Sequence, residues 1–152
     1  MITALAHDDT RDPRSRSSET GKSPTPEEEP SLLVVDDDPL VRRLLVRYFG
    51  GHGWDVTAAR ELEEAEALLD HCSYDAMITD LGLTELPRNE GLGVLTFARY
   101  RHPRMRIVVL TGQGDPRLET ETLRMGAHHF VQKPPSLDRL RGLVDPQLEA
   151  KS

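Results

Sequence analysis

The stretch "SLLVVDDDP", residues 31–39, predicts a buried strand that leads directly into a helix. Four large apolar residues follow Ser31 without a break, which is typical of a strand covered on both faces of a sheet. Asp38 and Pro39 then supply an acidic N-cap and a proline at the first helical position, where its missing N–H does no harm. The sequence therefore predicts a strand and a helix whose junction holds three acids.

The alternation of strand and helix continues beyond this unit. In the first helix Leu40, Leu44 and Tyr48 repeat every four residues, and Gly50 and Gly51 end it. Five such alternations with short connections predict an α/β domain, with a parallel sheet and helices on both of its faces. The further strands are expected at 54–59, 75–80, 106–111 and 128–132, and the further helices at 60–72, 91–101, 115–126 and from residue 136 onward.

The composition is that of one folded domain in a reducing compartment. A chain of 152 residues with 37% hydrophobic content can build one modest core. Residues 1–30 are rich in Ser, Thr, Pro and acid, so a disordered tail is expected there, followed by one domain at 31–150. With Cys72 as the single cysteine, an internal disulfide is excluded. No signal peptide is evident either. The single cysteine and the lack of a signal peptide together favour a cytoplasmic protein.

Charge and hydropathy argue against two classes of partner. The formal net charge is −7, with 19 basic and 26 acidic residues, whereas nucleic-acid binders normally present a basic face. No apolar run approaches the roughly 20 residues that a membrane helix needs. We therefore expect neither nucleic acid nor a membrane as a partner.

Polar side chains follow four of the five predicted strands at their carboxyl ends. Asp36 and Asp37 follow the first strand, and Asp80 ends the third. Thr111 ends the fourth strand and Lys133 follows the fifth. Because functional groups of open α/β sheets gather at this edge, we expect the five side chains to converge.

The three acids suggest a divalent cation and a nucleophile. Carboxylates that lie close together repel unless a cation joins them, and a set of hard oxygen ligands suits Mg²⁺. Asp80 ends a buried strand, so it is held rigidly and poorly solvated, as suits a carboxylate that forms an aspartyl phosphate. Thr111 can donate to a phosphoryl oxygen.

Lys133 is the only lysine between residues 23 and 150, a region where arginine supplies every other long cation. Its ammonium is a compact charge on a flexible stem. It can therefore pair with Asp80 at rest and with a phosphoryl group afterwards, which makes it a candidate site residue.

Residues 31 to about 145 resemble the receiver domain of two-component response regulators. "LLVVDDDP" at 32–39 resembles the acidic-pair motif and "YDAMITDLGL" at 74–83 the phosphoacceptor strand. "VVLTG" at 108–112 is similar to the switch-hydroxyl motif, and "GAHHFVQKPPS" at 126–136 to the aromatic-x-x-Lys-Pro end. All four motifs occur in order and at receiver-like spacing, which makes the resemblance specific.

The resemblance implies a doubly wound, five-stranded, flavodoxin-like sheet with strand order 2-1-3-4-5. It implies phosphoryl transfer to Asp80 from a histidine kinase or a histidine phosphotransfer protein. Asp37 would ligate Mg²⁺ directly and Asp36 largely through water, joined by Asp80 and the backbone carbonyl of Gly82. Apart from self-phosphorylation and self-dephosphorylation, no enzyme activity is implied.

The resemblance also implies a switch. Phosphorylation would draw Thr111 towards the site and let Phe130, three residues before Lys133, turn inward. The fourth helix, fifth strand and fifth helix would then repack, and a downstream protein would bind there. Because no output domain is evident, a stand-alone receiver is expected, acting by protein contact or onward phosphotransfer.

One segment departs from the family pattern. The family usually has Asp-Leu-x-Met-Pro at the phosphoacceptor, whereas "DLGLTELPRNEGLG" at 80–93 has Thr84 at the proline position and Pro87 three residues later. The loop is thus expected to be a few residues longer than usual. Its length could shape partner choice or the access of water to the phosphoryl group.

Two alternatives remain open from the sequence. In a haloacid dehalogenase-like phosphatase Asp36 would be the nucleophile and Asp38 the general acid, with Thr111 and Lys133 in matching places. Those enzymes need a further acidic pair after the lysine, however, and Asp80 would have no role. The other alternative is a receiver-shaped scaffold that binds partners without phosphorylation, for which the altered loop is the only support.

Overall fold

A computed structural model describes residues 29–81, 88–112 and 116–145. Nearly all of the tail predicted at 1–30 lies outside these residues, and so do Gly82 and most of the atypical loop. The predicted domain limits of 31 and 150 therefore stay predictions. No helix within the described ranges has the length and apolar character needed to cross a membrane.

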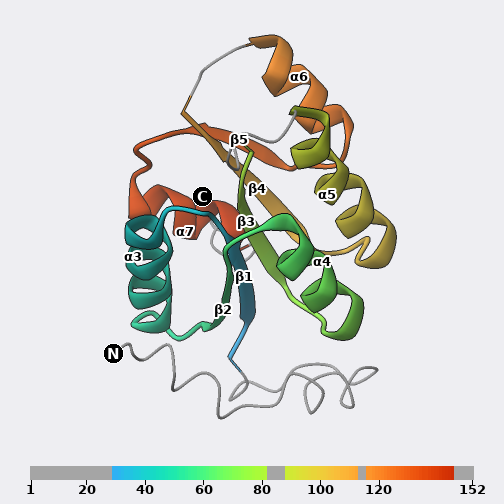
Figure 1. The fold of residues 1–152 in the computed structure, drawn as a ribbon. Coiled ribbons are helices and arrows are strands. Elements are labelled where there is room, and N and C mark those ends of the chain that lie inside the picture. Colours follow the sequence, from blue (N-terminus) through green and yellow to red (C-terminus); the bar gives the residue numbers. More distant parts are fainter. Residues whose placement is uncertain (1–28, 82–87, 113–115, 146–152) are drawn as a thin grey trace.

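Five parallel strands form one sheet in the order β2-β1-β3-β4-β5 (Figure 1). This is the α/β, doubly wound, flavodoxin-like arrangement expected from the sequence. The strand order reverses at the β1–β3 pair, where such sheets bind ligands at the carboxyl ends of the strands. The strands are β1 Ser31–Val35, β2 Asp55–Ala59, β3 Ala76–Asp80, β4 Arg106–Thr111 and β5 His129–Gln132.

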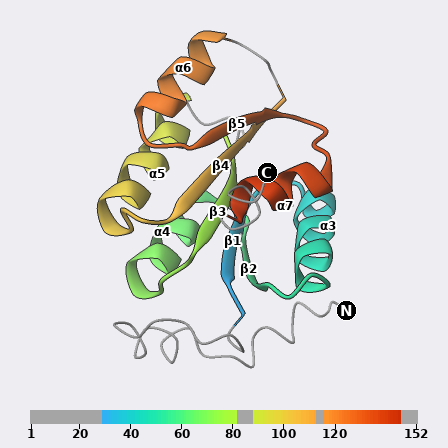
Figure 2. The same cartoon turned by 180° about the vertical axis from the view of Figure 1, so that it is seen from behind.

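Helices cover both faces of the sheet. Figures 1 and 2 show α3 and α7 on one face, and α4 and α5 on the other together with α6. Along β1, Leu32 and Val34 point to the α3 and α7 side, while Leu33 and Val35 point to the opposite side. The helices are α3 Pro39–Gly50, α4 Leu62–His71, α5 Arg88–Arg101, α6 Pro116–Arg124 and α7 Leu137–Val144.

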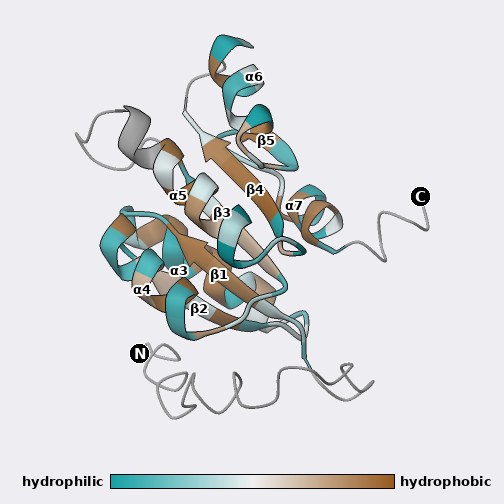
Figure 3. Ribbon diagram, turned by 90° about the vertical axis from the view of Figure 1, so that its right-hand side faces the viewer, coloured by the Kyte–Doolittle hydropathy of each residue, from teal (hydrophilic) through white to brown (hydrophobic). Residues whose placement is uncertain are grey.

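The sheet therefore separates two hydrophobic clusters. Strands β1 and β4 are the most apolar segments, whereas the helices carry polar residues on their outer sides (Figure 3). Leu62, Ala65 and Leu69 of α4, spaced three and four residues apart, are buried. Because both faces of β1, β3 and β4 are covered, their carboxyl ends are held in fixed positions, which places the site residues.

The apolar repeat noted in the first helix is not the row of residues that packs on the sheet. Leu40 and Leu44 are 71% and 52% exposed. An equally regular row, Val41, Leu45 and Phe49, contacts the core, and of the first row Tyr48 contacts it as well. Two overlapping four-residue repeats fit α3 equally well, and only the position of the sheet decides between them.

Capping side chains set the helix starts that the sequence predicts. The Asp38 carboxylate accepts a hydrogen bond from the Leu40 amide at 2.9 Å, which caps α3 before Pro39. The Ser136 hydroxyl accepts from the Arg139 amide at 3.2 Å and caps α7. These caps fix where each helix begins relative to the strand before it.

The turn between α6 and β5 depends on Gly126. Its φ is +123°, a region that residues with a side chain rarely adopt. A β-carbon at this position would lie 2.1 Å from Cγ and 2.7 Å from Cδ of Arg99. Arg99 of α5 thus crosses directly over the glycine, and the close approach joins α5 to the turn.

Gly126→Ala is expected to lower the free energy of unfolding by about 2 kcal/mol, because of the backbone strain and the clash with Arg99. The matched control is Gly93→Ala in the middle of α5, where a β-carbon meets open space. That change should raise the free energy by about 0.5–1 kcal/mol. Urea unfolding followed by the fluorescence of Trp54 measures both. Equal stability of Gly126→Ala and wild type would contradict this account of the turn.

Candidate functional site

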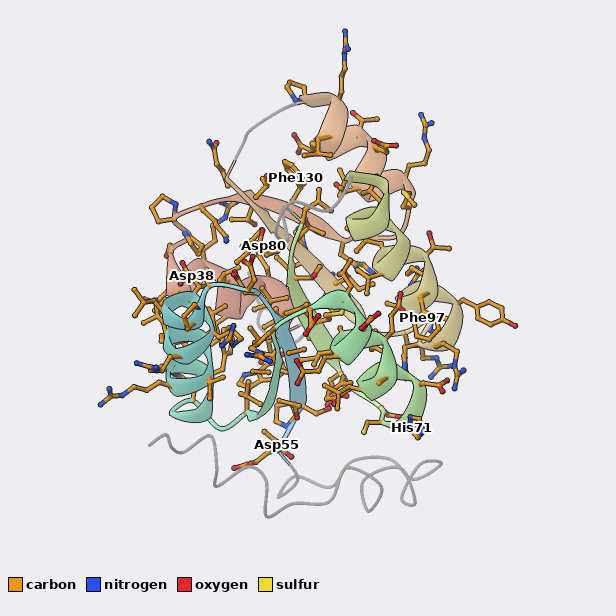
Figure 4. The ribbon with its side chains drawn as sticks, viewed as in Figure 1. Asp38, Asp55, His71, Asp80, Phe97 and Phe130 are labelled. Carbon is orange, nitrogen blue, oxygen red and sulfur yellow. The ribbon has the colours of Figure 1, made fainter. Side chains whose placement is uncertain are left out.

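The three predicted acids meet at the carboxyl edge of the sheet. Carboxylate oxygens of Asp36, Asp37 and Asp80 all lie within 4.8 Å of one another. Asp36 follows β1 and Asp80 ends β3, and these two strands are hydrogen-bonded neighbours. Asp36 is 1% and Asp80 7% exposed, whereas Asp37 is exposed. In Figure 4 Asp80 lies at the upper end of β3, above the start of α3 at Asp38.

Lys133 bridges the two buried acids. Its Nζ lies 3.1 Å from Oδ2 of Asp36 and 3.0 Å from Oδ2 of Asp80. Burial by itself lowers the pKa of Lys133, but the hydrogen bond and charge of Asp80, with a further contribution from Asp36, raise that pKa above its ordinary value. Lys133 is therefore protonated at neutral pH and offsets part of the negative charge.

Asp36 is held by contacts on its main chain and its side chain. Its amide donates to the carbonyl of Ala59 at 3.1 Å, and its Oδ1 accepts from the amide of Asp38 at 2.9 Å. Its backbone carbonyl accepts from Nη1 of Arg42 at 2.8 Å. These bonds fix the junction between β1 and α3, from which two of the three acids project.

The pKa of Asp36 is raised above its ordinary value. Burial of the carboxyl is the main cause, and the charge of Asp80 acts in the same direction. The amide of Asp38 and the ammonium of Lys133 lower the pKa but do not cancel the rise. The charged form of Asp36 is therefore held at an energetic cost, which a cation bound beside the carboxylate would relieve.

Thr111 and Lys133 lie on adjacent strand ends. The amide of Lys133 donates to the carbonyl of Thr111 at 2.7 Å, so the β4–β5 pairing extends to the lysine. Thr111 is 4% exposed. Phe130 of β5 is half-buried and packs on the cluster between the sheet and helices α4, α5 and α6 (Figure 4). Since alternate residues of a strand share a face, Thr111 lies on the same face as that cluster.

The donor set fits a hard divalent cation. Three carboxylates supply oxygen ligands, and the Lys133 ammonium contacts two of them. Two of the acids are nearly buried and one is exposed, which leaves room for water on one side of a bound ion. Such sets of oxygen ligands are those that Mg²⁺ prefers.

Two residues near the site were not singled out from the sequence. Arg42 of α3 reaches back to the carbonyl of Asp36. Thr79 precedes Asp80, and its buried Oγ1 has no hydrogen-bond partner within the described part of the chain. The position of Thr79 beside Asp80 was a usable signal, whereas the orientation of Arg42 depends on the angle at which α3 leaves the sheet.

Comparison with known proteins places the chain among signalling proteins. Response regulator protein PilR of Pseudomonas aeruginosa is 34% identical over 120 residues, which are 79% of this chain and 26% of PilR. Transcriptional regulatory protein AruR of the same organism is 38% identical over 107 residues, which are 69% of this chain and 43% of AruR. The chain thus spans less than half the length of these curated relatives.

A solved structure supports the fold, and a family model covers the described sheet and helices. The crystal structure of a response regulator protein from Burkholderia pseudomallei superposes with a TM-score of 0.72 at 23% identity, over 81% of this chain and 71% of that one. Residues 32–145 match the model of the response regulator receiver domain. The match spans all five strands and the site described above, and the chain belongs to the response regulator receiver domain family.

Proposed function

We propose that this chain is the phosphoacceptor of a two-component or phosphorelay system. It takes a phosphoryl group onto Asp80 from the phosphohistidine of a histidine kinase or a histidine phosphotransfer protein. The observation that carries the proposal is the cluster of three acids at the sheet edge, two of which, Asp36 and Asp80, hold the Lys133 ammonium between them. Receiver domains are signalling proteins rather than enzymes in the usual sense, and the cytoplasm is the proposed location.

The reaction needs one nucleophile and groups that accept the incoming charge. A carboxylate oxygen of Asp80 forms the new bond to phosphorus while the bond from phosphorus to the imidazole nitrogen breaks, and its electron pair stays on that nitrogen. Lys133 transfers its hydrogen bond from the Asp80 carboxylate to a phosphoryl oxygen. The hydroxyl of Thr111 donates to another phosphoryl oxygen.

The acids are proposed to hold Mg²⁺. Asp37 and Asp80 would hold it directly and Asp36 largely through water, together with the backbone carbonyl of Gly82, which lies outside the described residues. When bound, Mg²⁺ supplies positive charge that offsets the acids and the phosphoryl oxygens. Asp36 also keeps Lys133 in place, because it shares the ammonium with Asp80.

The output is proposed to pass through α6, β5 and α7. Thr111 and Phe130 lie on neighbouring strands, and Phe130 is only half-buried in the structure. Movement of Thr111 towards a phosphoryl group leaves space into which Phe130 can turn, and the surrounding face repacks. A downstream protein would bind this face.

Two contacts in the structure argue against the phosphatase alternative. Asp38, its general acid, caps α3 through the Leu40 amide. Asp80 would have no role in such a phosphatase, yet in the structure the Lys133 ammonium donates to both Asp80 and Asp36. The structure of the Burkholderia protein contains a phosphorylated aspartic acid and a calcium ion, which is the chemistry proposed here for Asp80.

The test is the intact mass of the protein after incubation with acetyl phosphate. In the presence of Mg²⁺ we expect a gain of one phosphoryl group, which disappears when EDTA removes the metal. Circular dichroism confirms that the protein is folded in both samples. If the folded protein gains no mass with acetyl phosphate or with a phosphorylated histidine phosphotransfer protein, the phosphoacceptor proposal fails. A scaffold that binds partners without phosphorylation then replaces it.

A further inference from the structure

Arg42 ties the second turn of α3 to the end of β1. Its guanidinium Nη1 donates to the backbone carbonyl of Asp36 at 2.8 Å, and its own amide donates to the carbonyl of Asp38 at 3.0 Å. The side chain is half-buried, so water competes for this bond less than it would on an open surface. Arg42 therefore spans the junction that carries the acids.

The carbonyl that Arg42 holds belongs to the peptide group between Asp36 and Asp37. That group is planar, so fixing its oxygen also fixes the direction in which the chain continues into Asp37. The Asp36 side chain has other partners, namely the amide of Asp38 and the ammonium of Lys133. The bond from Arg42 thus acts on the orientation of Asp37 relative to Asp36 rather than on the Asp36 carboxylate.

We propose that Arg42 is a positioning residue that holds the Asp36–Asp37 peptide in the orientation in which both acids face one cation. The inference rests on the proposed Mg²⁺ site and assigns a role to a residue that does not itself contact the ion. When residues that orient metal ligands without contacting the metal are removed, the affinity for the metal typically falls by about 10-fold or more.

The charge of Arg42 has the opposite effect on cation binding. A guanidinium near the acids repels a divalent cation, so loss of the charge alone should tighten Mg²⁺ binding. Loss of the hydrogen bond to the Asp36 carbonyl should weaken it. Arg43 is the next residue of α3 and is exposed, so it provides the same loss of charge without this bond. The two effects therefore differ in sign and can be separated.

The experiment compares wild type, Arg42→Met and Arg43→Met. Methionine keeps a long apolar stem and removes the donors and the charge. Mg²⁺ binding is measured by calorimetry on the full chain, at a temperature where circular dichroism shows each protein to be folded. The rate of phosphorylation by acetyl phosphate is measured in parallel as a function of Mg²⁺ concentration.

We expect Arg42→Met to bind Mg²⁺ about 10-fold more weakly. Arg43→Met should bind Mg²⁺ as tightly as wild type, or slightly more tightly. At saturating Mg²⁺ the phosphorylation rate of Arg42→Met should return to within about 2-fold of wild type, since Asp80 and Lys133 are untouched. If Arg42 only stabilised the fold, the folded variant would not show weaker Mg²⁺ binding together with a phosphorylation rate that recovers at saturating Mg²⁺.

Equal Mg²⁺ affinities of wild type and Arg42→Met would overturn the inference. Equal changes of Mg²⁺ affinity in Arg42→Met and Arg43→Met would overturn it too, because Arg42 would then act only through its charge. If Arg42→Met does not fold, Arg42→Gln is measured in the same way against Arg43→Gln. Failure of wild type itself to bind Mg²⁺ would overturn the proposed cation site and this inference together. Normal Mg²⁺ binding without phosphorylation would overturn only the phosphoacceptor proposal.

Discussion

Asp80→Asn is expected to gain no phosphoryl group from acetyl phosphate under conditions in which wild type is phosphorylated. A neutral amide oxygen lacks the charge that makes the carboxylate a nucleophile, so the rate should fall at least about 10³-fold. The change is nearly isosteric and Asp80 is only 7% exposed, so the site should keep its shape. Intact mass measured over time gives the rate.

The same variant should stay folded, with a free energy of unfolding close to that of wild type, because two effects oppose each other. Removing the charge of Asp80 relieves its repulsion of Asp36, but it also removes a charge that pairs with Lys133. Lys133 keeps its bond to Asp36. Urea unfolding of Asp80→Asn therefore separates loss of the nucleophile from loss of the fold.

A phosphoryl gain in Asp80→Asn would contradict the assignment of the nucleophile. Peptide mapping of the modified protein would then show whether Asp36 or Asp37 carries the group. Asp36→Asn serves as the matched control, because it removes a neighbouring buried acid and leaves Asp80 intact. It should reduce the rate through the cation site but should not abolish the reaction at high Mg²⁺.

Lys133→Met is expected to lower the free energy of unfolding by about 3 kcal/mol at neutral pH without divalent cations. The variant leaves Asp36 and Asp80 buried beside each other without the ammonium that bridges them. Breaking a buried pair on one side is costly because the remaining charges stay desolvated. Phosphorylation should also slow, since the phosphoryl oxygens lose a partner. Urea unfolding measured through Trp54 gives the free energy.

The loss of stability in Lys133→Met should depend on pH. Burial already raises the pKa of Asp36 in wild type, and loss of the ammonium raises it further. The folded variant then binds more protons than the unfolded chain above about pH 4, so its free energy of unfolding falls as pH rises, by up to about 1.4 kcal/mol per unit. At about pH 4 and below, where the unfolded carboxyls are protonated too, the difference from wild type should close.

Two controls test the electrostatic origin of this loss. Mg²⁺ should stabilise Lys133→Met more than it stabilises wild type, because the ion replaces the missing positive charge. Adding Asp36→Asn to Lys133→Met should recover most of the lost free energy, since one of the two repelling acids is removed. If the free energy of unfolding of Lys133→Met is lower than that of wild type by an amount independent of pH and of Mg²⁺, the cause is instead lost packing of the lysine stem.

Local patterns predicted the parallel strands and the placement of the acids, whereas the order of the strands came from the family resemblance. Apolar runs mark the strands, and the residue after each run must lie at the carboxyl edge whatever the loops do. This reasoning correctly brought together Asp36, Asp37, Asp80 and Lys133, with Thr111 beside them. The roles of these residues in phosphoryl transfer remain proposals.

What the sequence did not predict depends on the angles between elements. The rotation of α3 decides that Leu45 and Phe49 are buried while Leu40 and Leu44 are exposed, and two equally regular repeats gave no means to choose. The contact of Arg42 with the Asp36 carbonyl depends on the same rotation. Side-chain periodicity specifies that a helix has an inward face, but the rest of the core selects which face it is.

The crossing of Arg99 over Gly126 has an evolutionary consequence. A β-carbon at position 126 and a long side chain in this path at position 99 exclude each other, because the atoms would lie closer than any van der Waals contact permits. Among homologous sequences the two positions should therefore covary. Those that keep glycine at 126 can keep a long residue at 99, whereas those with a side chain at 126 should carry a shorter residue on α5. This pair of positions can identify homologues in which α5 packs against the turn as it does here.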